Sequence, residues 1–255
     1  MAGKQGGTQI TSTAANSTRR WIPVLAGVAT ITVAWVAVPG AEPIAHAAGF
    51  VAAPSVISGN SPDHLGTWTI HYQRVDGGDP VLADQINDRL DAEANREVQQ
   101  ATWDGSTRRP WTFDAAGTLH VGHMTVSEVF VGQYNTNEPH MPIQSVASIV
   151  CDSRGGVPIT WDTLFVDKQA GLTRLGDATA AALADVAPAD HVRDWRRQGQ
   201  FAPVDNNFKA WIPTTQGIEL HFPEFQFGGG LKVVTVPWAT VADQIRPEFA
   251  PIMGG

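Results

Sequence analysis

The stretch Asp79-Pro-Val-Leu-Ala-Asp-Gln-Ile-Asn-Asp-Arg-Leu-Asp-Ala-Glu-Ala-Asn-Arg-Glu-Val98 decides the fold. Its apolar residues recur at spacings of four, at Leu82, Ile86, Leu90, Ala94 and Val98. Charged residues fill the opposite side, at Asp84, Asp88, Arg89, Glu93 and Arg96. Asp79 is suited to cap a helix, and Pro80 is suited to its first position. The pattern predicts an amphipathic helix from Val81 to about Thr102 with a solvated, charged outer face.

Strands are predicted on both sides of this helix. In residues 66–72, large apolar residues alternate with Thr67, Thr69 and His71, which predicts a half-buried strand with His71 on the solvated face. Further strands are predicted over 110–114, 118–131 with a bulge at Gly122, 144–152, 208–212, 217–222 and 231–236. A short strand with a helical turn is predicted over 157–165, and further helices over 172–186, over 190–198 and from Pro237. Residues 48–65 lack periodicity and are interpreted as a flexible tether.

The order of these elements predicts the fold class. Strands and helices alternate without the regular spacing of βαβ units, which favours an α+β fold over a doubly wound sheet. We expect two small sheet-plus-helix units packed into one compact extracytoplasmic module. Glycines 228–230 lie between two predicted strands and are interpreted as a loop, because no phosphate-binding helix follows them.

The N-terminal region predicts export. Arg19-Arg20 precedes an uncharged apolar run from Trp21 to Val38, and Ala45-His46-Ala47 offers a small-residue cleavage site. We expect cleavage after Ala47. The run is also long enough to remain as an N-terminal membrane anchor over residues 21–38, so both outcomes stay open. The protein is therefore predicted to be extracellular or attached to the cell surface.

Charge and cysteine content exclude several classes of function. The chain carries a net charge of −8, and residues 1–47 carry +2, so the remaining residues carry −10. Such an acidic chain repels phosphate backbones, which argues against nucleic-acid binding and favours a basic partner. Cys151 is the only cysteine, so no intramolecular disulfide can form. It lies in a predicted strand and is interpreted as a buried apolar residue.

No sequence pattern nominates catalytic, cofactor-binding or metal-binding residues. A G-x-S-x-G nucleophile elbow is absent from the sequence. His120 and His123 could share a metal ion only if the bulge at Gly122 turned one of them, so we favour separate imidazoles. Asp84 and Asp88 are expected on a solvated helix face. Among the tryptophans, Trp103 and Trp195 lie in charged segments and are predicted to be exposed anchors of a binding surface.

Several short motifs in the second half of the chain resemble a known family. They are His140-Met-Pro142, Ser148-Ile-Val-Cys-Asp152, Gly156-Val-Pro-Ile-Thr-Trp-Asp-Thr-Leu-Phe165, Asn207-Phe208, Thr215–Phe225 and Val236-Pro-Trp238. Together they resemble the RsiV-type C-terminal domain, a domain of unknown function shared with secreted mycobacterial immunogenic proteins. The segment from Tyr72 to Asn87 is similar to the lobe that precedes this domain.

The resemblance implies an α+β fold. It also implies an actinobacterial protein of the cell envelope. Members of this family include membrane-anchored anti-sigma factors that bind lysozyme outside the cell, and esterase activity has been proposed for others. Here only residues 1–20 precede the apolar run, and they are polar and unpatterned, which argues against a sigma-binding segment. The predicted organisation is an export segment over 1–47, a tether over 48–65, an N-terminal lobe over 66–140 and an RsiV-type domain over 141–250.

These inferences lead to a prediction of function. We expect an exported, monomeric, non-enzymatic protein without cofactors that binds a protein or an envelope ligand. A basic protein such as lysozyme would suit its acidic charge. The alternative is a secreted hydrolase, in the first place an esterase.

Overall fold

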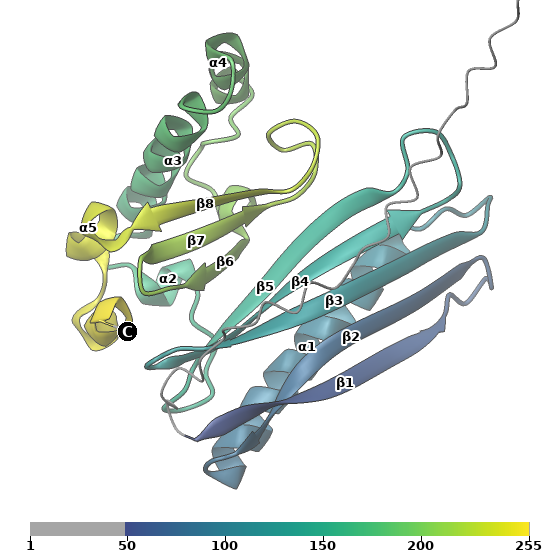
Figure 1. The fold of residues 1–255 in the computed structure, drawn as a ribbon, viewed down its shortest axis with the longest axis horizontal. Coiled ribbons are helices and arrows are strands. Elements are labelled where there is room, and N and C mark those ends of the chain that lie inside the picture. The colour runs from purple at the N-terminus through teal and green to yellow at the C-terminus, as the bar shows by residue number, and fades with distance from the viewer. Residues whose placement is uncertain (1–48, 255) are drawn as a thin grey trace, which may run out of the picture. The chain divides into compact units, whose positions relative to one another are not determined.

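The structure is a computed structural model that describes residues 49–254. The predicted export segment, residues 1–47, lies outside them. Five strands form the first sheet in the order β1-β2-β3-β4-β5 (Figure 1). They are β1 Phe50–Asn60, β2 Gly66–Gly77, β3 Trp111–Val121, β4 Thr125–Asn135 and β5 Ile143–Asp152. All neighbours are antiparallel except β2 and β3, which run parallel.

Strand β1 corrects the prediction of a tether over residues 48–65. All eleven of its residues pair with β2, and it forms an edge of the sheet. Pro54 stands in the middle of this edge strand, opposite Gln73. Proline lacks a backbone N–H, and edge strands are where a sheet tolerates it.

The predicted amphipathic helix is confirmed as α1, Pro80–Asp104. The Asp79 carboxylate accepts hydrogen bonds from the backbone N–H groups of Val81, at 2.8 Å, and Leu82, at 3.1 Å. The helix lies across one face of the five-stranded sheet (Figure 1). Its apolar stripe, which includes the fully buried Ile86 and Leu90, packs on Ile70 of β2 and Phe130 of β4 in one core.

Strands β2 and β3 pair only over the first half of β2. Their register runs from Gly66 opposite Trp111 to His71 opposite Ala116, after which β2 continues without this partner. Side chains then supply the missing hydrogen bonds. Asn87 of α1 accepts a hydrogen bond from the Val75 N–H at 2.7 Å and donates one to the Val75 carbonyl at 2.9 Å. The backbone of β2 is thus satisfied by α1 where the strand ladder ends.

The second sheet contains three antiparallel strands in the order β6-β7-β8. They are β6 Ala210–Pro213, β7 Gly217–Phe222 and β8 Lys232–Pro237. Helices accompany this sheet, namely α2 Trp161–Leu164, α3 Lys168–Ala184, α4 Ala189–Arg197 and α5 Trp238–Val241, with 3-10 turns η1 Asp205–Phe208, η2 Ala242–Gln244 and η3 Pro247–Gly254. Leu172, Leu175, Ile218 and Leu220 are among the residues of a separate core.

Polar side chains join the two sheets. The Ser148 hydroxyl of β5 accepts a hydrogen bond from the Trp211 N–H at 2.7 Å and donates one to the Trp211 carbonyl at 2.8 Å. Glu224, in the loop after β7, accepts one from the Gln144 N–H at 3.0 Å. All described residues, 49–254, belong to one compact unit. The predicted α+β fold of two sheets with helices is confirmed.

One predicted boundary and one predicted bulge differ from the structure. The sheets separate after Asp152 rather than at residue 140, because β5 completes the first sheet. Gly122 lies in a hairpin turn between β3 and β4, where its N–H donates to the Thr125 carbonyl at 2.8 Å, and not in a bulge. Within residues 49–254, no helix is long and apolar enough to span a membrane.

Candidate functional site

Two adjoining cavities form a groove along α1. The wider one has a volume of about 590 Å³ and lies between α1, β5 and the start of the second sheet. The narrower one, of about 270 Å³, lies near the C-terminal end of α1. Lys209 lines both cavities, which makes them neighbours. We call this pair of cavities the α1 groove.

Glu93 is buried in the wall of the α1 groove. The residue is 4% exposed, and its carboxylate lies 2.8 Å from the Arg96 guanidinium. Burial raises the pKa of Glu93, while the nearby Arg96 and Lys209 lower it. The sequence pattern placed Glu93 on the solvated face of the helix. That placement is wrong because β5 packs against this flank of α1, in addition to the strands that cover the apolar stripe.

Glu97 stands one helical turn after Glu93, on the same side of α1. Burial and, to a smaller extent, the neighbouring charge of Glu93 raise the pKa of Glu97 to about 7. Lys209 acts in the opposite direction on both carboxylates. The charge of the groove therefore changes near neutral pH.

Aromatic side chains form the wall opposite α1. The rings of Trp161 and Trp211 stack with centroids 4.4 Å apart. The Trp161 indole N–H donates to the Phe208 carbonyl at 3.1 Å, which fixes the ring. Both tryptophans are buried in the core, and they also line the wider cavity. This wall is rigid, since packing and a hydrogen bond both hold it.

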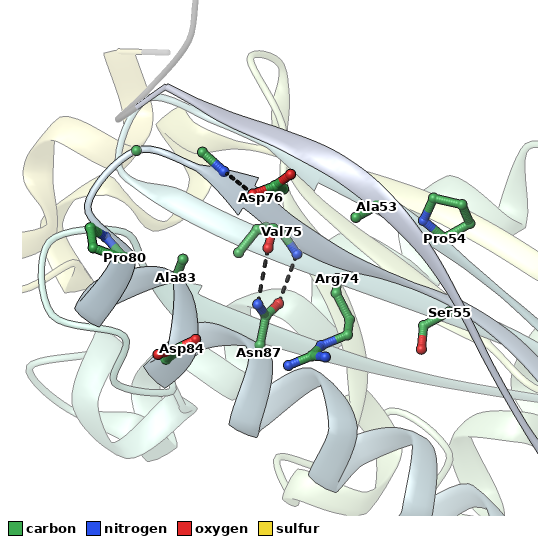
Figure 2. Close-up of a pocket in the computed structure, with 12 residues that line it drawn as sticks. Ala53, Pro54, Ser55, Arg74, Val75, Asp76, Pro80, Ala83, Asp84 and Asn87 are labelled. Carbon is green, nitrogen blue, oxygen red and sulfur yellow. Dashed lines mark hydrogen bonds between the residues drawn. The ribbon is translucent and has the colours of Figure 1, made fainter.

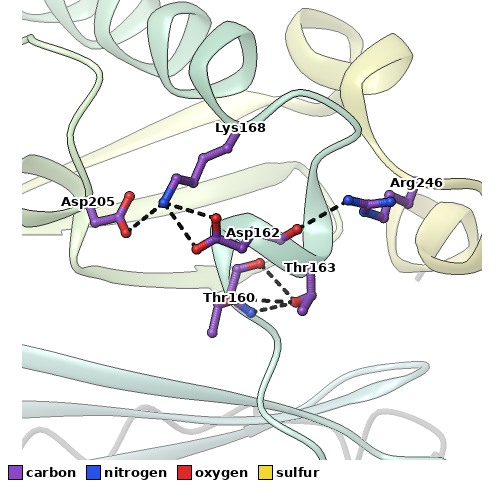
Figure 3. A network of polar contacts seen from close by, with 6 residues as sticks. All are labelled: Thr160, Asp162, Thr163, Lys168, Asp205 and Arg246. Carbon is purple, nitrogen blue, oxygen red and sulfur yellow. Dashed lines mark hydrogen bonds and ion pairs between the residues drawn. The ribbon is translucent and has the colours of Figure 1, made fainter.

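A polar network fixes the outer rim of the wider cavity (Figure 3). The Lys168 ammonium lies 3.1 Å from the Asp205 carboxylate and 3.0 Å from that of Asp162. Thr160 and Thr163 cap α2 through a 2.9 Å hydrogen bond from the Thr160 N–H to the Thr163 hydroxyl. The network connects α2, α3 and η1, so Asp205 is held in place by a lysine from outside the groove.

The narrower cavity combines an apolar interior with an acidic rim. Phe113, Tyr134, Ile143 and Val146 supply apolar surface, whereas Glu97 and Asp104 supply carboxylates. Trp103 precedes Asp104 and is 87% exposed. Trp103 is outside the cavity lining, but a large exposed aromatic residue next in sequence to a residue of an acidic, partly apolar cavity is a candidate for a binding surface.

A third cavity lies between the first two strands and the start of α1 (Figure 2). It has a volume of about 620 Å³ and is lined by Ser55, Arg74, Asp76 and Asn87, among others. The Asn87 amide bonds both backbone groups of Val75, and the Arg74 guanidinium lies 3.5 Å from Asp91. Asn87 and Arg74 thus contact neighbouring elements of the fold, and we take the α1 groove, with its buried carboxylates, as the candidate site.

The structure places the other residues that the sequence singled out. Cys151 is buried in β5, as predicted, and burial raises the pKa of its thiol to about 12. Trp103 is exposed, as predicted. Trp195 is instead partly buried and packs edge-on against Phe227, with ring centroids 5.3 Å apart. The residues His71, Asp84 and Asp88 are exposed.

His120 lies in a different cluster. It is opposite Ser127 in the pairing of β3 with β4. Among the residues of β7, Glu219 raises the pKa of His120 and His221 lowers it. Burial lowers the pKa of the imidazoles of His120 and His221. Ser127 is 1% exposed, so its hydroxyl is closed to solvent. In the part of the chain from 49 to 254, no group of three His, Cys, Asp or Glu residues is arranged to hold a metal ion.

Comparisons with known proteins identify the fold. No family model matches the chain, and no curated protein matches it. A crystal structure of a DUF3298 family protein from Bacteroides fragilis has a TM-score of 0.57 at 13% identity, over 82% of this chain and 98% of that chain. A DUF3298 family protein from Pseudomonas aeruginosa has a TM-score of 0.49 at 11% identity, over 78% and 94%.

The likeness to the first of these structures shows a shared α+β fold. The family name denotes a domain of unknown function, so it assigns no activity. The resemblance to the RsiV-type domain stays a prediction from sequence.

Proposed function

We propose that this is an exported binding protein that holds a basic protein partner at the C-terminal end of α1. The observation that carries the proposal is the 87% exposed Trp103, followed in the chain by Asp104, which lines a cavity together with Glu97. Trp103 would supply the aromatic contact. A lysine or arginine of the partner would place its aliphatic stem against Phe113 and Tyr134 and its charge at the carboxylates.

Charge supports a basic partner. Residues 48–255 carry −10, so long-range attraction would speed association with a basic protein, and salt would weaken it. The pKa of Glu97, about 7, adds a pH dependence. Above that value Glu97 is negatively charged, so the attraction grows between pH 6 and pH 8. Lysozyme is a basic protein that an experiment can supply directly.

The experiment is a calorimetric titration of the full-length protein with hen-type lysozyme at low and high salt. Binding at low salt that weakens at high salt is expected. Trp103→Ala should weaken it by about 2 kcal/mol, which is the scale of an interface hot spot. Asp104→Asn should weaken it less. Val186→Ala and Asp185→Asn change exposed residues elsewhere and should leave affinity unchanged. No complex at low salt would remove lysozyme as the partner.

A secreted esterase is the second candidate, and the pairing of His120 with Ser127 is the observation that favours it. Ser127 is buried, however, and no hydrogen bond joins the two side chains among residues 49–254. The test is turnover of short p-nitrophenyl esters by the full-length protein. Robust turnover that Ser127→Ala or His120→Ala abolishes would overturn the binding proposal.

Export has its own test. Cleavage after Ala47 would leave Ala48 as the first residue of the protein in the culture supernatant, which N-terminal sequencing reads directly. A cell-bound chain that keeps residues 21–38 would instead support an anchor.

A further inference from the structure

We propose that the wider cavity of the α1 groove is a second binding site, which takes a small oxyanion such as a carboxylate or a phosphate-type group. Arg89, Arg96 and Lys209 would hold it. This site differs in charge from the acidic surface that the basic protein partner would use. It therefore stands independently of the proposed function.

Three cationic side chains converge on this cavity from two directions. Arg89 and Arg96 stand seven residues apart on α1, which is about two helical turns, so they share one side of the helix. Lys209 comes from the opposite wall, between η1 and β6. All three residues are exposed. A cluster of cations that lines one cavity is unusual in a domain with a net charge of −10.

Neighbouring carboxylates neutralise only part of this cluster. Glu93 lies 2.8 Å from Arg96, and Asp205 is already engaged by Lys168 at 3.1 Å. In the described part of the chain, neither Arg89 nor Lys209 has a carboxylate within 4.0 Å. The cavity thus keeps a surplus of positive charge that a bound anion would balance.

The shape of the cavity suits a small anion. Its volume is about 590 Å³, and the stacked pair of Trp161 and Trp211 closes one side. Thr160 and Asn206 also line it and add neutral hydrogen-bonding groups. An arginine guanidinium can bind both oxygens of a carboxylate or a phosphate-type group at once, which favours oxyanions over halides.

Binding of an anion should be coupled to protonation. The charged groups that line the wider cavity are Arg89, Glu93 and Arg96 from α1, and Asp205 and Lys209 from the opposite wall, with Lys168 behind Asp205. Glu97 lines the adjoining narrower cavity, beside Glu93 and Lys209. The pKa values of Glu93 and Glu97 are already raised by burial. A nearby anion would raise them further, so the protein would take up protons on binding. Anions should consequently bind more tightly at pH 6 than at pH 8.

The test is a calorimetric titration of the full-length protein with sodium sulfate and with sodium acetate at constant ionic strength. Sulfate stands in for a tetrahedral phosphate-type group and acetate for a carboxylate, and the charge of each is constant from pH 6 to pH 8. Saturable binding of at least one anion is expected. Lys209→Gln and Arg89→Gln should each weaken it about tenfold, since each removes a charged hydrogen-bond donor.

Arg193→Gln is the matched control, because Arg193 is an exposed cation on α4, outside the cavity. Binding of sulfate alone would identify a tetrahedral anion, and binding of acetate alone a carboxylate. The proposal is overturned if neither anion binds saturably, or if Arg193→Gln weakens binding as much as Lys209→Gln. If the protein binds an anion but not lysozyme, lysozyme is removed as the partner in the proposed function and this anion site stands.

Discussion

The carboxyl group of Glu128 on β4 reaches across β3 and accepts a 2.7 Å hydrogen bond from the backbone N–H of Gln73 on β2. Gln73 lies just beyond the last residue of β2 that pairs with β3, so this side chain replaces a missing ladder bond. Glu128 is fully buried, and burial raises the pKa of its carboxyl group to about 8. A protonated carboxyl group therefore holds the sheet together at neutral pH.

Glu128 should make stability depend on pH. The folded state keeps a proton up to about pH 8, whereas an unfolded chain releases it near the ordinary value of 4.5. The free energy of unfolding should thus fall as pH rises between about 5 and 8, by up to ~1.4 kcal/mol per pH unit from this group. Glu128→Gln should flatten that slope in urea unfolding curves. Glu248→Gln, at an exposed position, should not change it.

Gly117 should resist substitution because it leaves room for Glu128. A Cβ atom at this position would lie 2.1 Å from Oε1 of Glu128. Gly117→Ala is therefore expected to lower the free energy of unfolding by about 1–3 kcal/mol through overpacking. A Cβ at Gly155 would meet nothing within 4 Å, so Gly155→Ala is the control with an expected change near zero. Equal effects of the two variants in thermal unfolding would contradict this account.

Asn87 should contribute more to the stability of the fold than an ordinary helix residue does. Asn87→Ala would leave the N–H and carbonyl groups of Val75 buried without a partner, at a cost of about 2–4 kcal/mol. Asn95→Ala provides the comparison, since Asn95 bonds only the carbonyl of its own helix at an exposed site. Chemical denaturation of both variants measures the difference. A cost below that of Asn95→Ala would rule out the role of Asn87 in β2.

Cys151 should be inert in the folded protein. Its sulfur is buried, and the raised pKa of about 12 leaves almost no thiolate at neutral pH. A disulfide reagent such as 5,5′-dithiobis(2-nitrobenzoate) should react slowly with the native chain and rapidly in denaturant. Because the chain contains one cysteine, the signal reports this site alone. Fast labelling without denaturant would show that the strand opens.

The sequence predicts the elements whose signals are local. Asp79 and Pro80 mark the start of α1, and the period of four defines its buried stripe. The alternation in Gly217–Phe222 predicts β7 with its observed bounds. Strand β1 escapes prediction because Ala52, Pro54 and Gly59 interrupt its alternation, and because its stability comes from pairing with β2. Pairing partners are not visible in the local sequence.

The candidate site is harder to predict from the sequence than the fold. Trp103 is correctly expected to be exposed, because charged residues surround it. Glu93 is misplaced, since helix periodicity assigns residues to one buried face and one solvated face. In the structure, β5 packs against the flank of α1 that carries Glu93, so this side of the helix is buried in addition to the apolar stripe. Lys209 carries no sequence signal at all, because only the fold brings it across the α1 groove toward Glu93 and Glu97.

Pro54 has a consequence for how copies of this protein behave at high concentration. An open strand edge normally offers a continuous row of donors and acceptors on which another chain can grow. The Gln73 N–H points toward Glu128, so the backbone of its opposite residue, Pro54, faces outward. The row of backbone N–H and C=O groups on the outer edge of β1 therefore lacks a donor at its centre. We therefore expect Pro54 to oppose fibre-like growth from this edge, where a continuous ladder would have to form.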